Sequence, residues 1–380
     1  MAFNNSPFIF MIYLFILAAF AILTVVFAAH YFLFQSLVYL LGITNQVYLN
    51  IIKNIFIFLP LSFIFASILI NRFSNIFVRL YYIIAASWFG IALYFTAACL
   101  LAYFIIFLGK FFAFDINQKK LIISLFLATT AIIIYGIIAA QNIKIKELNI
   151  TLPNLPSEWR GKTAIFISDL HLGTIDNYEF AAKVSDQIDN LKPDMLLIGG
   201  DFYDGQANVN LNRLAQIFST IKTPLGKFFV TGNHEEFGDN TKYINAITKA
   251  GIKVLDNEMS EINGMQIIGV DYKSAYNKDD YETILKNINI DKNKPSILLR
   301  HVPDKIKVAS KFGISLELCG HAHGGQLFPI QIIEHFLYDG FQYGLKKSDS
   351  TIVYTSSGVG TWGPPMRILA APEIVKIKFE

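Results

Sequence analysis

Long apolar runs dominate the first 143 residues of the chain. Four of them reach the roughly 20 residues that a transmembrane helix needs, and they cover residues 7–34, 51–71, 80–109 and 121–143. The first run is too long for a signal-peptide core and follows no basic residue, so we interpret it as a retained span rather than a cleaved leader. The pattern predicts an all-α transmembrane bundle of about four helices over residues 1–145.

The pattern changes after Lys144, where hydropathy falls. Residues 146–160 contain Pro153, Pro156 and Trp159 and are expected to form a linker. Residues 161–380 then alternate between strand-length apolar runs and segments of helical period, which is typical of a layered α/β domain. The predicted strands cover 163–168, 195–198, 228–231, 297–299 and 315–318, and the predicted helices cover 178–191, 211–221 and 241–250.

Charge supports the same division of the chain. No Asp, Glu, Lys or Arg precedes Lys53, and only six of the 32 basic and one of the 29 acidic residues precede Lys144. This leaves 26 basic and 28 acidic residues for the second part, which is therefore close to neutral. Proteins that bind nucleic-acid phosphates usually carry a basic excess, so no nucleic-acid partner is expected.

Each of the five predicted strands is followed by side chains that can bind a metal ion. They are Asp169 and His171, then Asp201, then Asn233 and His234, then His301, and finally His321 and His323. A single aspartate after a strand is often a helix cap, and a single buried histidine is more often a hydrogen-bonded structural residue than a ligand. Because strand ends in α/β sheets collect at one edge, five such clusters together favour a common metal site.

The order and spacing of these residues closely resemble the calcineurin-like metallophosphoesterase family. The segments that carry the resemblance are Asp169-Leu-His171, Gly200-Asp201, Gly232-Asn233-His234-Glu235, His301 and Gly320-His321-Ala-His323. The resemblance extends over nearly all of residues 160–380, and the run at 320–326 is similar to that of membrane-associated bacterial phosphoesterases. It implies a four-layer α/β sandwich and a metal-dependent phosphoric ester hydrolase, and it does not cover the N-terminal spans.

The resemblance also implies two divalent metal ions. By position, the first ion would be held by Asp169, His171, Asp201 and His323, and the second by Asp201, Asn233, His301 and His321. Asp201 would bridge the two ions, because dications about 3.5–4 Å apart need anions between them. A mixture of imidazole, carboxylate and amide ligands suits Mn²⁺, Fe, Co²⁺ or Zn²⁺ better than Ca²⁺.

His234 has the position of the family's catalytic histidine. The hypothesis is that water activated by the metals attacks phosphorus while a positively charged His234 stabilises the phosphoryl oxygens and protonates the leaving group. The alternative is a structural histidine. Two further residues are candidates for substrate binding: Asp204, which could equally cap the next turn, and Arg367, which follows a Gly/Pro-rich stretch that could equally be a rigid turn.

Tethering to a membrane bears on the substrate. We expect a phosphate ester or pyrophosphate of a lipid, of a lipid-linked precursor or of a small molecule, and the arrangement resembles membrane-associated relatives that hydrolyse UDP-diacylglucosamine. The aromatic segment with His335, Tyr338, Phe341 and Tyr343 is interpreted either as core or as a lip that receives a lipid tail. The remaining alternative functions are a non-catalytic metal-binding membrane scaffold or sensor, and a transporter with an accessory domain.

A transport pathway would normally need ionisable groups inside the spans, and His30 is the one candidate, expected at the membrane interface near the end of the first run. The basic residues of short loops set membrane orientation. Here they are nearly balanced and slightly favour a cytoplasmic hydrolase domain at a bacterial inner membrane. The oligomeric state does not follow from the sequence.

Overall fold

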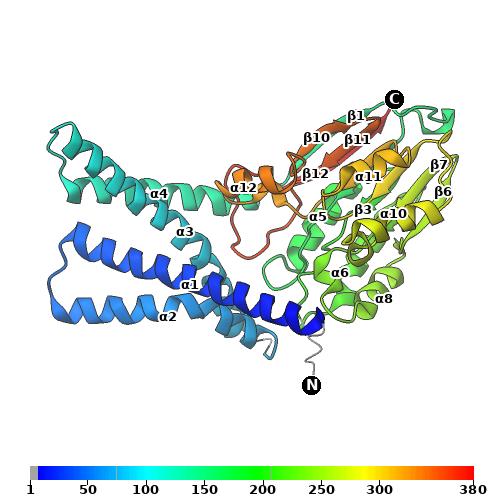
Figure 1. Ribbon diagram of the computed structural model, residues 1–380. Coiled ribbons are helices and arrows are strands. Elements are labelled where there is room, and N and C mark those ends of the chain that lie inside the picture. Colours follow the sequence, from blue (N-terminus) through cyan, green and yellow to red (C-terminus); the bar gives the residue numbers. More distant parts are fainter. Residues whose placement is uncertain (1–6, 74, 207) are drawn as a thin grey trace, which may run out of the picture. The chain divides into compact units, whose positions relative to one another are not determined.

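The computed structural model describes residues 7–73, 75–206 and 208–380, and the chain divides into two compact units, Met1–Ile134 and Tyr135–Glu380. The first unit is helical (Figure 1). Its helices are α1 (Pro7–Leu41), α2 (Gln46–Ile70), α3 (Ile76–Phe111) and α4 (Gln118–Ala140), whose last residues belong to the second unit.

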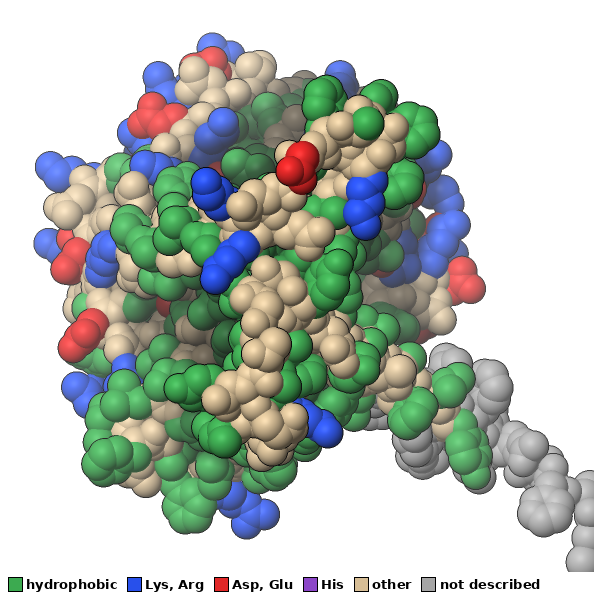
Figure 2. All heavy atoms as spheres, turned by 90° about the vertical axis from the view of Figure 1, so that its left-hand side faces the viewer, with side chains coloured by type: hydrophobic (Ala, Val, Ile, Leu, Met, Phe, Trp, Pro, Cys, Tyr) green, Lys and Arg blue, Asp and Glu red, His purple; other side chains and the backbone are tan. Residues whose placement is uncertain are grey.

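Among the described residues, four helices are long and apolar enough to cross a membrane, which confirms the predicted bundle. Large apolar side chains such as Ile84, Phe107 and Leu127 remain exposed along them, as lipid-facing residues do. Figure 2 shows hydrophobic side chains over most of the surface nearest the viewer, with scattered Lys and Arg side chains. Asparagine residues are the N-caps of two of the helices. The side chains of Asn45 and Asn75 accept hydrogen bonds from backbone N–H groups in the first turns of α2 and α3.

His30 is buried in the interior of α1, so its predicted place near the end of the first span was wrong. Its ring is 3% exposed. The indole Nε1 of Trp88 donates to His30 Nε2 at 3.0 Å, and His30 Nδ1 donates to the carbonyl oxygen of Val26 at 2.8 Å. The physical reason is that α1 continues to Leu41, which places this histidine in the helix interior rather than near its end.

The second unit contains two six-stranded sheets. The first has the order β1-β12-β2-β3-β4-β5 and the second β10-β11-β9-β8-β7-β6. The strands of the first sheet are β1 (Lys144–Ile150), β2 (Thr163–Ile167), β3 (Met195–Ile198), β4 (Lys227–Phe229), β5 (Lys253–Val254) and β12 (Glu373–Phe379). The strands of the second are β6 (Glu258–Ile262), β7 (Met265–Gly269), β8 (Ser296–Leu299), β9 (Leu316–Cys319), β10 (Gly344–Ser348) and β11 (Thr351–Thr355).

The helices of this unit include three that cover the first sheet, namely α5 (Tyr178–Asn190), α6 (Leu211–Ile217) and α8 (Thr241–Lys249). The second sheet is covered by α10 (Lys278–Asn287) and α11 (Ile306–Lys311). Shorter elements are α7 (Asn233–Glu236), α9 (Tyr272–Ala275), α12 (Ile330–Leu337) and the 3₁₀ turns Ser157–Trp159, Phe218–Thr220 and His323–Gly325.

Alternation along the strands builds the layers, because successive side chains of a strand point to opposite faces. In β2, Ile165 and Ile167 pack against the helices, while Ala164 and Phe166 join the core between the sheets. In β8, Leu298 faces the opposite helices. Helices therefore flank two stacked sheets, which confirms the predicted four-layer α/β sandwich.

The predicted linker and domain boundary need correction. Strand β1 (Lys144–Ile150) contains the start of the expected linker 146–160 together with the two residues before it. This strand pairs in parallel with β12. Leu148 and Ile150 enter the core between the sheets, as does the fully buried Trp159. The alternation of β1 is short and its other positions carry Lys and Glu, so the segment resembled a polar connection. The second unit begins at Tyr135 rather than at residue 161.

Candidate metal centre

The predicted metal-binding residues follow five strands that belong to both sheets. Loops after β2, β3 and β4 come from the first sheet, and loops after β8 and β9 come from the second. The loops of the first sheet stay paired beyond the strands, since the backbone N–H groups of Asp169 and His171 donate to the carbonyl oxygens of Gly200 and Asp201. The site is therefore built at the carboxyl ends of strands from both sheets, and not from a single sheet.

Three overlapping groups of side chains come together here, namely Asp169, His171 and His323, then Asp201, His301 and His321, and then His171, Asp201 and His234. Within each group the possible ligand atoms lie within 4.8 Å of one another. Nε2 of His171 is 3.0 Å from Nε2 of His323. His301 Nε2 lies 3.1 Å from Asp201 Oδ2, 3.2 Å from His321 Nδ1 and 3.2 Å from Oδ1 of Asn233.

The donor set fits divalent cations. The Nε2 atoms of His171 and His323 point at each other. Asp201 Oδ2 lies 3.8 Å from Nε2 of His171, and Asp169 Oδ1 lies 3.7 Å from Nε2 of His323. His301 Nδ1 donates to the carbonyl oxygen of Gly199 at 2.7 Å. In the neutral ring that bond keeps the proton on Nδ1 and leaves the lone pair of Nε2 toward the cluster, which is the arrangement that a metal-ligating histidine needs.

Burial and crowded charge shift the protonation of the cluster. Burial alone would lower the pKa of His301, but the Asp201 carboxylate outweighs it and raises that pKa to about 9. Burial is likewise outweighed at His171, where Asp204 and Asp201 raise the pKa to about 8. Burial and the neighbouring His301 lower the pKa of His321 to about 3. At neutral pH, His301 and His171 therefore hold protons that bound cations would displace.

The backbone of the site is strained. Five of the seven predicted ligands have positive φ angles, a conformation that costs non-glycine residues about 1–3 kcal/mol each. These residues are Asp169 (54°), His171 (46°), Asp201 (49°), His321 (69°) and His323 (51°). Two motif glycines also make room for carboxylates, because a Cβ at Gly232 would overlap Asp201 and a Cβ at Gly320 would overlap Asp169.

Glu235 holds two of the site's loops together. Its side chain is fully buried, and Oε2 accepts hydrogen bonds from the backbone N–H groups of Asp201 (3.0 Å) and Gly232 (2.9 Å). Oε1 accepts from the N–H of Tyr203 at 2.9 Å. Burial and the Asp201 charge raise the pKa of Glu235 to about 7. Sequence reasoning assigned this residue no role, although its place three residues after Gly232, at the start of α7, is typical of helix capping.

His234 lies beside the cluster, as predicted. Its ring packs edge-on against His171 with 4.6 Å between centroids, and its backbone N–H donates to Asp201 Oδ1 at 2.9 Å. Nδ1 donates to the carbonyl oxygen of Asp204 at 3.2 Å. Burial lowers the pKa of His234, with Asp201 the main opposing influence. The expected positive charge at neutral pH is therefore not favoured by this environment.

Asp204 lies behind two histidine rings rather than in front of the cluster. Its Oδ1 is 3.6 Å from Nδ1 of His171 and 3.8 Å from Nδ1 of His234. Its Oδ2 accepts a hydrogen bond from Gln206 at 2.8 Å. A carboxylate in this place orients imidazole rings, which differs from the substrate contact that the sequence suggested.

Arg367 is also engaged behind a predicted ligand, His323. Its side chain is 1% exposed. The guanidinium donates to the carbonyl oxygens of Gly360 and Ser357, the latter at 2.7 Å, and Nη2 donates to Nδ1 of His323 at 3.2 Å. The predicted role as a phosphate partner does not fit this environment, because the donors are already used to position His323 and the loop after Ser356.

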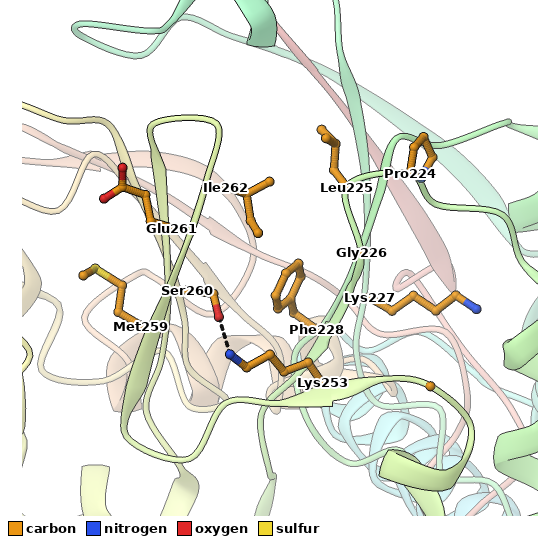
Figure 3. Close-up of a pocket in the computed structure, with 11 residues that line it drawn as sticks. Pro224, Leu225, Gly226, Lys227, Phe228, Lys253, Met259, Ser260, Glu261 and Ile262 are labelled. Atoms are coloured by element: carbon orange, nitrogen blue, oxygen red, sulfur yellow. Dashed lines mark hydrogen bonds between the residues drawn. The ribbon is translucent and has the colours of Figure 1, made fainter.

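Several cavities open on the described part of this unit. One of about 240 Å³ adjoins the cluster, and its walls include His301, His321, Tyr272, Leu337 and Tyr338. A larger one of about 650 Å³, shown in Figure 3, lies between the start of β4 and the hairpin strand β6, with Lys253 hydrogen-bonded to Ser260 in its wall. The first of these two cavities is lined by residues of the metal cluster, and the second is not.

The domain has two stacked sheets flanked by helices, and carboxylates and imidazoles gather at the carboxyl ends of strands from both sheets. This combination is typical of metal-dependent hydrolases. A family model described as calcineurin-like phosphoesterase matches residues 162–325. An uncharacterized metallophosphoesterase of Aquifex aeolicus is 37% identical over 221 residues, which cover 56% of this chain and 83% of that protein. The chain therefore belongs to the calcineurin-like phosphoesterase family.

Two other relatives extend the comparison. An uncharacterized metallophosphoesterase of Helicobacter pylori J99 is 33% identical over 242 residues, covering 62% of this chain and 64% of that protein. A transmembrane protein with metallophosphoesterase domain from Danio rerio is 32% identical over 267 residues, covering 66% of this chain and 60% of that protein. The chain thus spans less than two thirds of the length of these two relatives.

Proposed function

We propose that this protein is a membrane-anchored phosphoesterase with a two-metal site, which hydrolyses a phosphate ester or pyrophosphate of a lipid or lipid-linked precursor. The observation that carries the proposal is the convergence of ligand-type side chains from five strand ends in three overlapping groups. Membership of the family and four membrane-capable helices support it.

The proposed ligands form two sets, one for each metal ion, which follow the contacts between their side chains. Asp169, His171 and His323 would hold one ion and Asn233, His301 and His321 the other, with Asp201 shared. Asp201 is suited to the shared position because its Oδ2 lies 3.1 Å from His301 Nε2 and 3.8 Å from His171 Nε2, one nitrogen from each group. Such ions would activate water and neutralise charge on the phosphoryl oxygens, and borderline metals suit these donors.

His234 is proposed as the proton donor to the leaving group. Its Nδ1 is occupied by the Asp204 carbonyl, so Nε2 is the atom available to substrate. Burial lowers the pKa of His234, and the arrival of a phosphate anion would raise it. In this scheme the histidine gains its proton together with the substrate and passes it to the departing oxygen.

A lipid substrate is supported by the surroundings of the cluster. The 240 Å³ cavity beside His301 and His321 has Leu337 and Tyr338 in its wall together with the charged Arg300 and Asp304, and its apolar part suits a phosphoester with a hydrocarbon group. We place the active site on the cytoplasmic face of a bacterial inner membrane, on the basis of the loop charges.

The test uses the full chain purified in detergent, because a fragment that began after Ile150 would remove strand β1. Hydrolysis of p-nitrophenyl phosphate and bis-p-nitrophenyl phosphate is measured after chelation and after addition of Mn²⁺. We expect metal-dependent turnover that Asp201→Ala abolishes and that Asp239→Ala, a change at an exposed aspartate, preserves. A wild-type protein that binds metal and turns over neither ester would favour a scaffold or sensor instead.

A second pair of esters tests the substrate class separately. Dodecyl p-nitrophenyl phosphate and methyl p-nitrophenyl phosphate have the same reacting group and differ in their hydrocarbon chain. We expect a higher kcat/KM for the dodecyl ester. Equal values for the two esters, at full metal occupancy, would reject the lipid substrate while leaving the phosphoesterase intact.

A further inference from the structure

Exposed apolar side chains of the second unit gather around α12. Among the described residues after Ala140, most large apolar side chains that remain exposed lie between Phe328 and Leu369. None of the residues of α12 is buried. The group, which we name the α12 face, consists of Phe328, Ile332, Ile333, Phe336, Leu337, Trp362 and Leu369, with exposures that reach 76% at Phe336 and 74% at Leu369.

The α12 face carries little charge. Between Gln326 and Gly344 the charged residues are Glu334 and Asp339, with His335 as a further titratable group, and no Lys or Arg occurs there. Between Ser356 and Ala371 the one charged residue is the buried Arg367. Contiguous exposed apolar surface of this kind marks an interaction site rather than an ordinary water-facing surface.

Hydrogen bonds make the α12 face a single built surface. Gln326, just before α12, donates to the carbonyl oxygens of Trp362 (2.9 Å) and Pro364 (3.0 Å), and it accepts from the N–H of Trp362 at 3.0 Å. The N–H of Phe328 donates to the carbonyl oxygen of Ile368 at 3.2 Å. The two segments that supply the face are therefore held together by several bonds.

The α12 face is continuous with the end of membrane span α4. The N–H of Arg367 donates to the carbonyl oxygen of Gly136 at 2.9 Å, and a Cβ on Gly136 would come within 2.8 Å of Ile368. The backbone next to Leu369 thus packs directly on α4. Since Gly136 lacks a side chain, this close approach is possible.

The length of α4 sets the depth of this contact. With 23 residues, α4 is about 35 Å long at 1.5 Å per residue, against a hydrocarbon core of about 30 Å. Gly136 precedes the last helical residue, Ala140, by four positions, or about 6 Å. It therefore lies close to the boundary between hydrocarbon and headgroups, and Tyr135 is an aromatic residue of the kind enriched there.

We propose that the α12 face lies in the interface of the bilayer, with its apolar side chains at the boundary between headgroups and acyl chains. The occupant of the face is lipid, because the face is apolar, nearly free of charge and anchored to a membrane span at interfacial depth. Leu337 and Tyr338 also line the cavity beside His301 and His321. The cavity would therefore open where a lipid phosphoester resides. This consequence rests on the proposed function, whereas the docking itself does not.

The docking is tested by labelling the full chain in nanodiscs. Both native cysteines are buried, so a bimane label is attached at Phe336→Cys or, as the control, at the exposed position Lys286→Cys on α10. We expect brominated lipids to quench the label at position 336 several-fold more than that at 286, and aqueous iodide to do the reverse. Iodide-dominated quenching at position 336, or disulfide-linked dimers of that variant, would overturn the proposal in favour of solvent or a second copy.

A charged variant links docking to catalysis. In nanodiscs, Ile333→Glu combined with Phe336→Glu is expected to reduce hydrolysis of the dodecyl ester at least tenfold while leaving that of soluble p-nitrophenyl phosphate within twofold. Equal effects on the two esters would refute a membrane role for the face. If wild-type protein hydrolyses neither ester, the proposed function fails, and the quenching result still decides the docking.

Discussion

Replacing Glu235 with glutamine tests whether the fully buried carboxylate holds the loops of the metal site. The wild-type side chain accepts three backbone N–H groups, from Asp201, Tyr203 and Gly232. A glutamine amide has one oxygen and one NH₂, so at least one of these donors must face another donor. Leaving a buried donor unsatisfied costs about 1–3 kcal/mol, which for a domain of this size corresponds to a melting temperature lower by about 2–12 °C.

The sign of the pH dependence follows from the pKa of Glu235. Burial and Asp201 raise that pKa from 4.5 to about 7, so the native state holds the proton more tightly than the unfolded state does. The contribution of the wild-type carboxyl to stability is therefore fully present below pH 4.5 and declines as pH rises to about 7. Glutamine does not titrate, so the difference between wild type and Glu235→Gln should be larger at pH 5 than at pH 8.

Thermal unfolding of the chelated full chain in detergent measures the effect, followed by the fluorescence of a protein in which Trp88 and Trp362 are replaced by phenylalanine, so that the buried Trp159 reports on the core between the sheets. Glu236→Gln is the control, since Glu236 neighbours Glu235 in α7 and accepts a side-chain hydrogen bond from Asn240. An unchanged melting temperature for Glu235→Gln would show that the three bonds add no net stability. A difference that grows with pH would show that the N–H groups lower the pKa of the carboxyl instead.

Three further predictions concern the metal site. The pKa values of His301 and His171 are raised to about 9 and 8, so Mn²⁺ affinity should increase from pH 6 to pH 9 and Mn²⁺ loading at pH 7 should release protons. Calorimetry in buffers of different ionisation enthalpy measures this release, and binding without proton release would contradict the prediction. His234→Ala should retain metal content by mass spectrometry and lose about 10²–10⁴-fold in kcat, and normal turnover of the metal-loaded variant would rule out its catalytic role. Asp204→Asn should weaken metal affinity about 10–100-fold, whereas a raised KM with unchanged metal affinity would restore its role in substrate binding.

The sequence predicted those features of the fold that depend on local patterns. Apolar runs identified the four spans, and short apolar runs of strand length identified β2, β3, β4, β8 and β9 near their observed positions. It missed β1, because Lys144, Lys146 and Glu147 occupy solvent-facing positions and hide the alternation of Leu148 and Ile150. Which strands share a sheet was also beyond the pattern, since pairing depends on contacts between residues distant in the chain.

The candidate site shows the same limit. Side chains with metal-binding chemistry were recognisable from their types and spacing, and the structure brings them together. Asp204 and Arg367 were also singled out, yet both lie behind histidine rings, at His171 and at His323. Residue type cannot distinguish a group that faces substrate from one that faces the back of a ligand. Only the three-dimensional path of the loops after Asp201 and Ser356 decides it.

The strain of the site explains why it needs such supporting residues. Five predicted ligand positions with positive φ cost about 5–15 kcal/mol together, which is comparable to the whole stability of a typical domain. The backbone keeps these angles because other groups hold the same loops: Glu235 binds the N–H of Asp201, and Arg367 binds His323. The supporting residues therefore act on backbone conformation as much as on charge. A search for ligand-type side chains alone finds the residues that would touch metal and overlooks those that hold them in place.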